Sequence, residues 1–70
     1  MDHDIVNIFT FHAPTEEQKL KYEAIRSKAM ELAKVIYDNT PPCADQSAAI
    51  RKVREAVMTA NASIALNGIV

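Results

Sequence analysis

The sequence is poor in the residues that cross-link or break a chain: among its 70 residues are one cysteine, one glycine and three prolines. Cys43 alone cannot close an internal disulfide bond, so no disulfide framework exists. No secretory signal and no apolar run long enough to cross a membrane appears either. These absences predict an intracellular, reducing setting with no membrane partner.

A surplus of positive charge is also missing, since eight lysines and arginines face nine aspartates and glutamates, giving a formal net charge of -1. Such a balance supplies no general attraction to polyanions, which disfavours coating of DNA or RNA. His3 and His12 lack metal-ligand spacing, and Cys43 has no neighbouring base. The carboxylates are scattered, so we expect no metal, no cofactor and no enzyme activity.

What is present is a globular composition with 49% apolar residues, enough for one small helical domain. Residues 1–14 alternate loosely between apolar and polar, and Pro14 disfavours helix just before it, so we expect an extended arm. Thr15 and Gln18 form a capping-box pattern that predicts a helix over 15–38. The prolines Pro41 and Pro42 then predict a loop over 39–45.

A second helix is expected over 46–67. Its start is ambiguous, because either Thr40, with Pro41 in the first helical position, or Asp45 suits the N-cap. Gly68 suits a left-handed termination. The predicted fold is therefore all-α, an extended arm followed by a two-helix antiparallel hairpin.

The apolar residues of the first helix spread over roughly 160° of its circumference, more than one partner helix covers. They are Tyr22, Ile25, Ala29, Met30, Leu32, Ala33, Ile36 and Tyr37. The second helix has one regular seam and, in its second half, a further apolar strip. The seam consists of Ile50, Val53, Val57, Ala60 and Ile64, and the strip of Met58, Ala62, Ala65 and Leu66. This surplus predicts homo-oligomerisation, with sites where copies meet.

An aromatic and imidazole cluster precedes the first helix, at Phe9, Phe11 and His12. These rings either pack over the helix pair or form a platform on which nucleobases stack. Arg26 lies within the apolar stripe. Its guanidinium either pairs with Glu23 or with a carboxylate on another chain, or extends past Tyr22 into water, or contacts a phosphate.

Further polar positions leave similar alternatives. Lys28 and Lys21 lie on a different flank of the helix from Arg26. Either they are solvated at the edge of the apolar stripe, or one of them contacts a phosphate that lies between protomers. The basic run Arg51, Lys52 and Arg54 points in divergent directions, which favours solvated surface over a nucleic-acid-binding face. Asn61 borders the seam of the second helix. Either it is a polar residue that sets the register of helix packing, or it contacts a ligand.

Several segments resemble the small phage-encoded anti-CBASS sponge proteins. They are Phe9–Pro14 (FTFHAP), Lys21–Ala29 (KYEAIRSKA), Glu31–Ala33 (ELA) and Glu55–Ala65 (EAVMTANASIA). The order and spacing of these segments cover most of the chain after Ile8. The resemblance implies a helical homohexamer that binds cyclic dinucleotides such as 3',3'-cyclic GMP-AMP at protomer interfaces. It would withhold them from bacterial effectors without degrading them, in the cytoplasm of the infected host.

The resemblance also implies residue roles. Phe11 would stack on a base and Arg26 would meet the phosphates, with His12, Pro14 and Lys28 as further lining. The usual aromatic residue in that family is tyrosine, so Phe11 keeps the stacking face and loses the hydroxyl.

Some members of that family hold cyclic trinucleotides in a second pocket, near a three-fold axis. Asn61 matches one residue of that pocket, and Thr59 lies nearby. The family pattern often has arginine where this chain has Leu66, and losing a charge-assisted bond costs roughly 1.5 to 3 kcal/mol. We therefore expect weak or absent trinucleotide binding.

Two other classes of function fit parts of the sequence. A helical homo-oligomeric protein-interaction module, such as an adaptor or antitoxin-like protein, explains the wide apolar stripe equally well. A DNA-binding regulator fits less well, because the charge balance lacks the basic footprint that phosphate contact requires.

Overall fold

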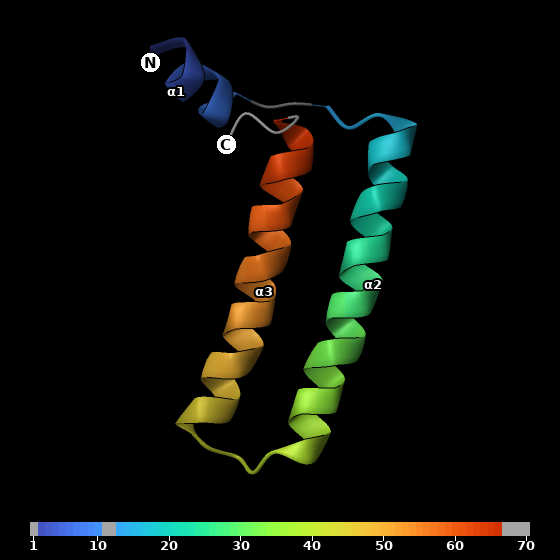
Figure 1. Cartoon of the computed structure of the whole chain (residues 1–70), viewed down its shortest axis with the longest axis vertical. Helices are drawn as coiled ribbons and strands as arrows, with labels where there is room; N and C mark the ends of the chain where they lie inside the picture. Colours follow the sequence, from blue (N-terminus) through green and yellow to red (C-terminus); the bar gives the residue numbers. More distant parts are fainter. Residues whose placement is uncertain (1, 11–12, 67–70) are drawn as a thin grey trace.

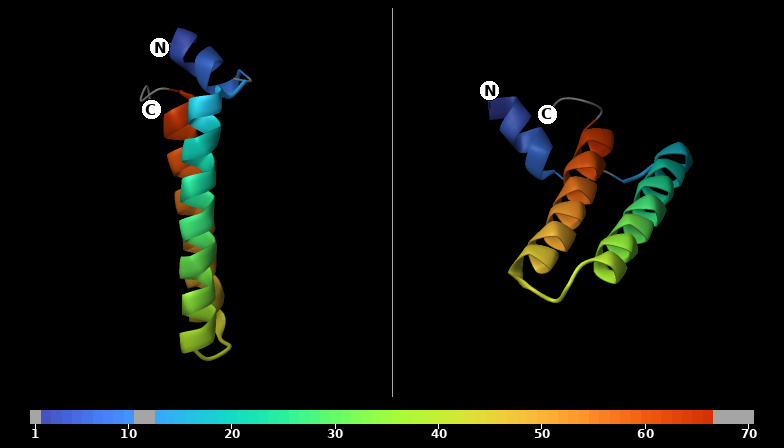
Figure 2. Two further views of the ribbon diagram at one scale, coloured as in Figure 1. Left: turned by 90° about the vertical axis from the view of Figure 1, so that its right-hand side faces the viewer. Right: turned by 60° about the horizontal axis from the view of Figure 1, so that its bottom comes forward.

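The computed structural model describes residues 2–10 and 13–66, which form three helices: α1 (Asp2–Phe9), α2 (Glu16–Asn39) and α3 (Ala44–Ala65). Figure 1 shows α2 and α3 side by side and antiparallel, with α1 near the end of the hairpin where α2 begins and α3 ends. A side view shows that the hairpin is a single layer of two helices (Figure 2). The predicted all-α antiparallel hairpin is confirmed.

The start of α2 is fixed by the capping box that the sequence predicts. The Thr15 hydroxyl oxygen accepts a bond from the Gln18 amide nitrogen at 3.1 Å, and Gln18 Oε1 accepts one from the Thr15 amide nitrogen at 3.0 Å. Gln18 Nε2 also donates to the carbonyl oxygen of Ile64 at 3.1 Å. One glutamine therefore both caps α2 and ties its first turn to the last turns of α3.

A second glutamine fastens the opposite end of the hairpin. Nε2 of the buried Gln46 lies 3.2 Å from the Tyr37 carbonyl oxygen, 3.0 Å from that of Thr40 and 3.1 Å from the Thr40 hydroxyl. The last carbonyls of a helix have no partners within the helix, and this amide supplies a donor for them.

The connection between the helices differs from the predicted loop over 39–45. Helix α3 begins at Ala44 rather than 46, and its N-cap is Cys43, not Thr40 or Asp45. Cys43 is extended and makes no side-chain cap, while Asp45 falls in the first turn, where a carboxylate favours the positive helix end. The helix thus begins two residues earlier than predicted, and Gln46, whose amide bonds to the end of α2, lies within its first turn. The predicted terminator Gly68 lies outside the described residues.

The seam between α2 and α3 follows spacings of three and four residues, as predicted for α3. Half-buried side chains from α2 are Gln18, Tyr22, Ile25, Ala29, Ala33 and Ile36, and they face the predicted seam of Ile50, Val53, Val57, Ala60 and Ile64. The other three residues of the predicted stripe on α2, Met30, Leu32 and Tyr37, are exposed. Met30 is 67% exposed and Leu32 is 51% exposed, so one hairpin leaves much of its apolar surface uncovered.

The N-terminal segment corrects the prediction of an extended arm, because residues Asp2–Phe9 form helix α1. The loose alternation also fits a helical arc, since Ile5, Val6, Ile8 and Phe9 fall on one side at 100° per residue. The Thr10 hydroxyl donates to the Val6 carbonyl at 2.5 Å and closes the last turn. All four apolar side chains are exposed. Of the helices described, none has the length and hydropathy needed to span a membrane.

Replacing Gln46 by Ala should lower the free energy of unfolding by about 1 to 2 kcal/mol, because the carbonyls of Tyr37 and Thr40 lose their donor. Urea denaturation followed by circular dichroism measures the change. Ser47→Ala, one position along and exposed, is the matched control and should change the stability by less than about 0.5 kcal/mol. Equal effects of the two substitutions would contradict this role of Gln46.

Candidate functional site

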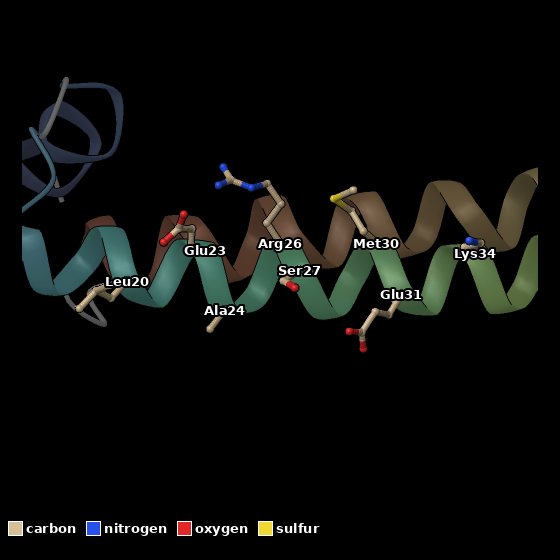
Figure 3. A pocket seen from close by; sticks show the side chains of 8 residues that line it. All are labelled: Leu20, Glu23, Ala24, Arg26, Ser27, Met30, Glu31 and Lys34. Atoms are coloured by element: carbon tan, nitrogen blue, oxygen red, sulfur yellow. The ribbon is translucent and has the colours of Figure 1, made fainter.

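Arg26 lies on the exposed side of α2, on the same side as Glu23 (Figure 3). Among the described residues, ion pairs along α2 join Lys19 to Glu16, Lys21 to Glu17 and Lys28 to Glu31, and none includes Arg26. Figure 3 shows Arg26, Glu23 and Met30 projecting from the same side of α2. The structure thus forms no ion pair between Arg26 and Glu23, and the alternative of a carboxylate on another chain stays a prediction.

Arg26 belongs to an apolar groove of about 250 Å³ that α2 and α3 form together. Its apolar lining includes Ala29, Met30 and Ala33 of α2 and Val53, Val57 and Met58 of α3. Arg54 of α3 lines the same groove. One face of the hairpin thus combines an apolar floor with a guanidinium from each helix, and we call it the arginine groove.

The sequence predicted solvated surface for the run Arg51, Lys52 and Arg54, and all three residues are exposed. The structure separates these three residues: Arg54 lines the arginine groove and Lys52 lines the groove on the other face, while Arg51 is among the lining residues of neither. The register in which the two helices pair decides which of these residues share a face with Arg26. Pairing Ala29 with Val53 in an antiparallel hairpin brings Arg54 to the same face as Met30 and Arg26.

Lys28 lies on the opposite broad face, as its predicted different flank required. That face has a groove of about 480 Å³ between α2 and α3, lined among others by Lys28 and Leu32 of α2 and by Lys52 and Ala56 of α3. Nζ of Lys28 is 3.4 Å from a carboxylate oxygen of Glu31. One protomer therefore cannot present Lys28 and Arg26 to the same small ligand, and only two copies together could do so.

A wider depression of about 730 Å³ follows the outer edge of α2. Figure 3 shows its lining, with Leu20, Glu23, Glu31 and Lys34 along one helix. Arg26 lines this depression too, together with two carboxylates, whereas the arginine groove has no carboxylate in its lining.

Of the aromatic part of the predicted site, the structure describes only the residues on either side of Phe11 and His12. Phe11 and His12 lie outside the described residues, and Pro14 is exposed in the connection before α2. Phe9 is 85% exposed, so its ring does not pack over the helix pair, and that alternative is wrong for this residue.

The predicted second site is not assembled within one chain. Thr59 is exposed, Asn61 is half-buried and Leu66 is the most buried apolar side chain of those described, at 5% exposed. Oδ1 of Asn61 is buried and accepts no hydrogen bond from the part of the chain that the structure describes. In those same ranges, 2–10 and 13–66, no three His, Cys, Asp or Glu side chains are grouped to hold a metal ion.

These features define a class: a small helical hairpin with apolar grooves on both faces and basic side chains at their rims. Residues 1–65 match the family model described as Acb2/Tad1, hairpin domain. The chain belongs to this family, that of the phage anti-CBASS sponges, and the resemblance noted in the sequence is confirmed. Membership indicates a binding protein that sequesters cyclic nucleotides. Neither a curated protein nor a solved structure matches the chain.

Replacing Asn61 by Ala should change the free energy of unfolding by less than about 0.5 kcal/mol. Loss of packing atoms destabilises the hairpin, but removal of a buried acceptor without a donor offsets that loss. Chemical denaturation of the two proteins tests the expectation, with Ile64→Ala, also half-buried on α3, as a positive control that should cost at least about 2 kcal/mol. A loss for Asn61→Ala equal to that of Ile64→Ala would show that its side chain is a structural requirement.

Proposed function

We propose that this protein binds and sequesters cyclic dinucleotides of the 3',3'-cyclic GMP-AMP class and thereby blocks activation of CBASS effectors in the cytoplasm of the infected bacterium. The observation that carries the proposal is the exposed guanidinium of Arg26 on an apolar groove, without an ion pair to any described residue, in a chain of the sponge family. An arginine in this position has donors available for an incoming phosphate.

The chemistry of a cyclic dinucleotide suits the residues of this region. Each ligand has two phosphodiesters, which take charge-assisted bonds from the Arg26 side chains of two protomers, and two bases, whose faces stack on an aromatic ring. We assign the stacking role to Phe11, and further contacts to His12, Pro14 and Lys28. Phe11 offers a π face and no hydroxyl, so any bond that a tyrosine would donate is missing.

The placement of Arg26 and Lys28 on opposite faces supports a site between protomers. A hairpin with exposed Met30 and Leu32, together with the exposed apolar face of α1, also favours burial against other copies. We propose a homohexamer, the assembly that the family resemblance implies. Sequestration then means that the ligand is held at an interface and released unaltered.

We propose that binding of cyclic trinucleotides is weak or absent. Leu66 is apolar and buried, so it offers no donor to a phosphate where the family pattern often has arginine. Asn61 and Thr59 remain the residues proposed for that pocket, and two residues of separation place them on different sides of α3.

A second candidate function has one observation in its favour, the exposed apolar face of α1. An amphipathic helix of this kind suits a protein-interaction module such as an adaptor or antitoxin-like oligomer. Capture of a stable polypeptide partner by a protein that binds no cyclic nucleotide would favour this alternative. We propose no DNA or RNA polymer as partner, because the formal net charge of -1 supplies no attraction to one.

Calorimetry with 3',3'-cyclic GMP-AMP should show binding to the purified protein, and Arg26→Ala should weaken it at least about tenfold, the effect of losing a bond to a charged group. Phe11→Ala should cost about 1 to 3 kcal/mol of binding free energy through lost stacking. Lys34→Ala, also exposed on α2, is the matched control and should bind normally.

The same experiment separates sequestration from degradation. Ligand recovered after heat denaturation of the complex should be unaltered by mass spectrometry. No binding by the wild-type protein, or full affinity in the Phe11 and Arg26 double variant, would overturn the proposed function.

Native mass spectrometry should show a hexamer at micromolar concentration. Ile8→Asp in α1 and Leu32→Asp in α2 should each shift the population to smaller species, because a carboxylate on a buried apolar contact is costly to desolvate. Lys34→Asp, two residues from Leu32 and already polar, should leave the hexamer intact. A wild-type monomer would contradict the proposed assembly.

A further inference from the structure

We propose that α1 of one copy docks in the groove between α2 and α3 of a second copy, on the face that carries Lys28 and Lys52. We call this groove the lysine groove. The rest of its lining is apolar and includes no carboxylate. This docking goes beyond a count of protomers, because it makes each copy supply residues to the nucleotide site of its neighbour.

Helix α1 lacks a packing partner in the described part of its own chain. It packs against neither α2 nor α3, and Figures 1 and 2 show it beyond the end of the hairpin where α2 begins. Isolated helices shorter than about 12 to 15 residues are marginal in water, and α1 has eight. Its apolar side, with Ile5, Ile8 and Phe9, is exposed. The helix therefore depends on an apolar surface of another molecule.

The lysine groove has the length and the floor that such a helix needs. Along α2 its lining extends from Ile25 to Leu32, eight residues, which is about 12 Å at 1.5 Å per residue and equals the length of α1. Ala29, Ala56 and Ala60 also line it, and their small side chains allow a helix to approach closely. The arginine groove is smaller, at about 250 Å³ against about 480 Å³.

The charges of the two segments are complementary. The sequence of α1 contains Asp2 and Asp4 and neither lysine nor arginine. In the groove, Lys52 forms no ion pair with another described residue, and the pair of Lys28 with Glu31 is exposed and therefore weak. Opposite charges steer the encounter of two surfaces and oppose a wrong orientation. An acidic helix therefore fits this groove.

The occupant is α1 of a second copy and not α1 of the same chain. The lysine groove begins at Ile25, more than two helical turns after the start of α2 at Glu16, whereas α1 lies beyond that start. The consequence for the nucleotide site rests on the proposed function. Phe11 follows the last residue of α1 by two positions, so docking of α1 anchors the proposed stacking residue on the neighbour.

Disulfide trapping between chains tests the docking without any nucleotide. In a Cys43→Ser background, one chain carries Ile8→Cys, and a second chain, made heavier by an affinity tag, carries Ala56→Cys. After co-expression and oxidation, mass spectrometry should show a mixed disulfide. Met58→Cys in place of Ala56→Cys is the matched control. It is also exposed on α3 but lines the arginine groove, and it should give at least about fivefold less mixed disulfide.

A charge reversal tests the complementarity. Lys52→Glu in the chain that carries Ala56→Cys should lower the yield of mixed disulfide at least about threefold, because a carboxylate then faces an acidic helix. Arg51→Glu makes the same change of charge at the preceding residue, which is exposed but does not line the lysine groove. Its yield should stay within about 1.5-fold of the unreversed chain.

Calorimetry tests the consequence for the nucleotide site. Ile8→Asp should weaken binding of 3',3'-cyclic GMP-AMP at least about tenfold, because a carboxylate on the docked side of α1 releases the segment that carries Phe11. Full affinity in this variant would show that docking of α1 does not complete the site.

Three outcomes of the trapping experiment would overturn the docking itself. Equal yields with Ala56→Cys and Met58→Cys would show that α1 does not select the lysine groove. An internal disulfide in a monomer that carries both Ile8→Cys and Ala56→Cys, without mixed disulfides, would place α1 on its own hairpin. No disulfide at either position would leave α1 to a different polypeptide. If trapping succeeds and wild type binds no cyclic dinucleotide, the docking stands and the proposed function fails.

Discussion

The constraint on which the rest of the structure depends is that two helices in a single layer share only one seam. Of the side chains described, only Leu66 and Gln46 are buried, and the seam residues themselves are half-buried. Small domains gain little from so thin a core. The seam therefore leaves apolar surface uncovered on both faces of the hairpin. This surface supplies the grooves that a ligand or a second copy can occupy.

The register of that seam decides which charges share a face. Gln18 ties the start of α2 to Ile64, and Gln46 ties the end of α2 to the start of α3, so the helices are fixed at both ends. With this register, Arg26 and Arg54 line one groove while Lys28 and Lys52 line the other. The side-chain amides of Gln18 and Gln46, together with the apolar seam, thus support the register that places these charges on separate faces.

The sequence was sufficient where one local rule decided the structure. The capping box at Thr15 and the spacing of the α3 seam are short-range patterns, and both predictions are confirmed. It was insufficient where two patterns competed: the first residues fit an alternating strand loosely and a helical arc equally well, and α1 formed. That Arg54 lines the same groove as Arg26 could not be predicted from the sequence, because it depends on the pairing of two helices, which no single-helix pattern contains.

Leu66 contributes to the packing of the hairpin and offers no donor to an anionic ligand. An arginine at this position would keep its guanidinium in water or against an anion, because burying an unpaired charge is costly. Leucine is instead buried beside the last turn of α3, where its amide nitrogen donates to the Ala62 carbonyl at 2.9 Å. This end of the hairpin has therefore gained apolar burial and lost a donor for phosphate. Arg26 lines the groove between Met30 and Met58, whereas the exposed Arg51 does not, so the proposed contact of Arg26 with phosphate falls on the face that carries this groove.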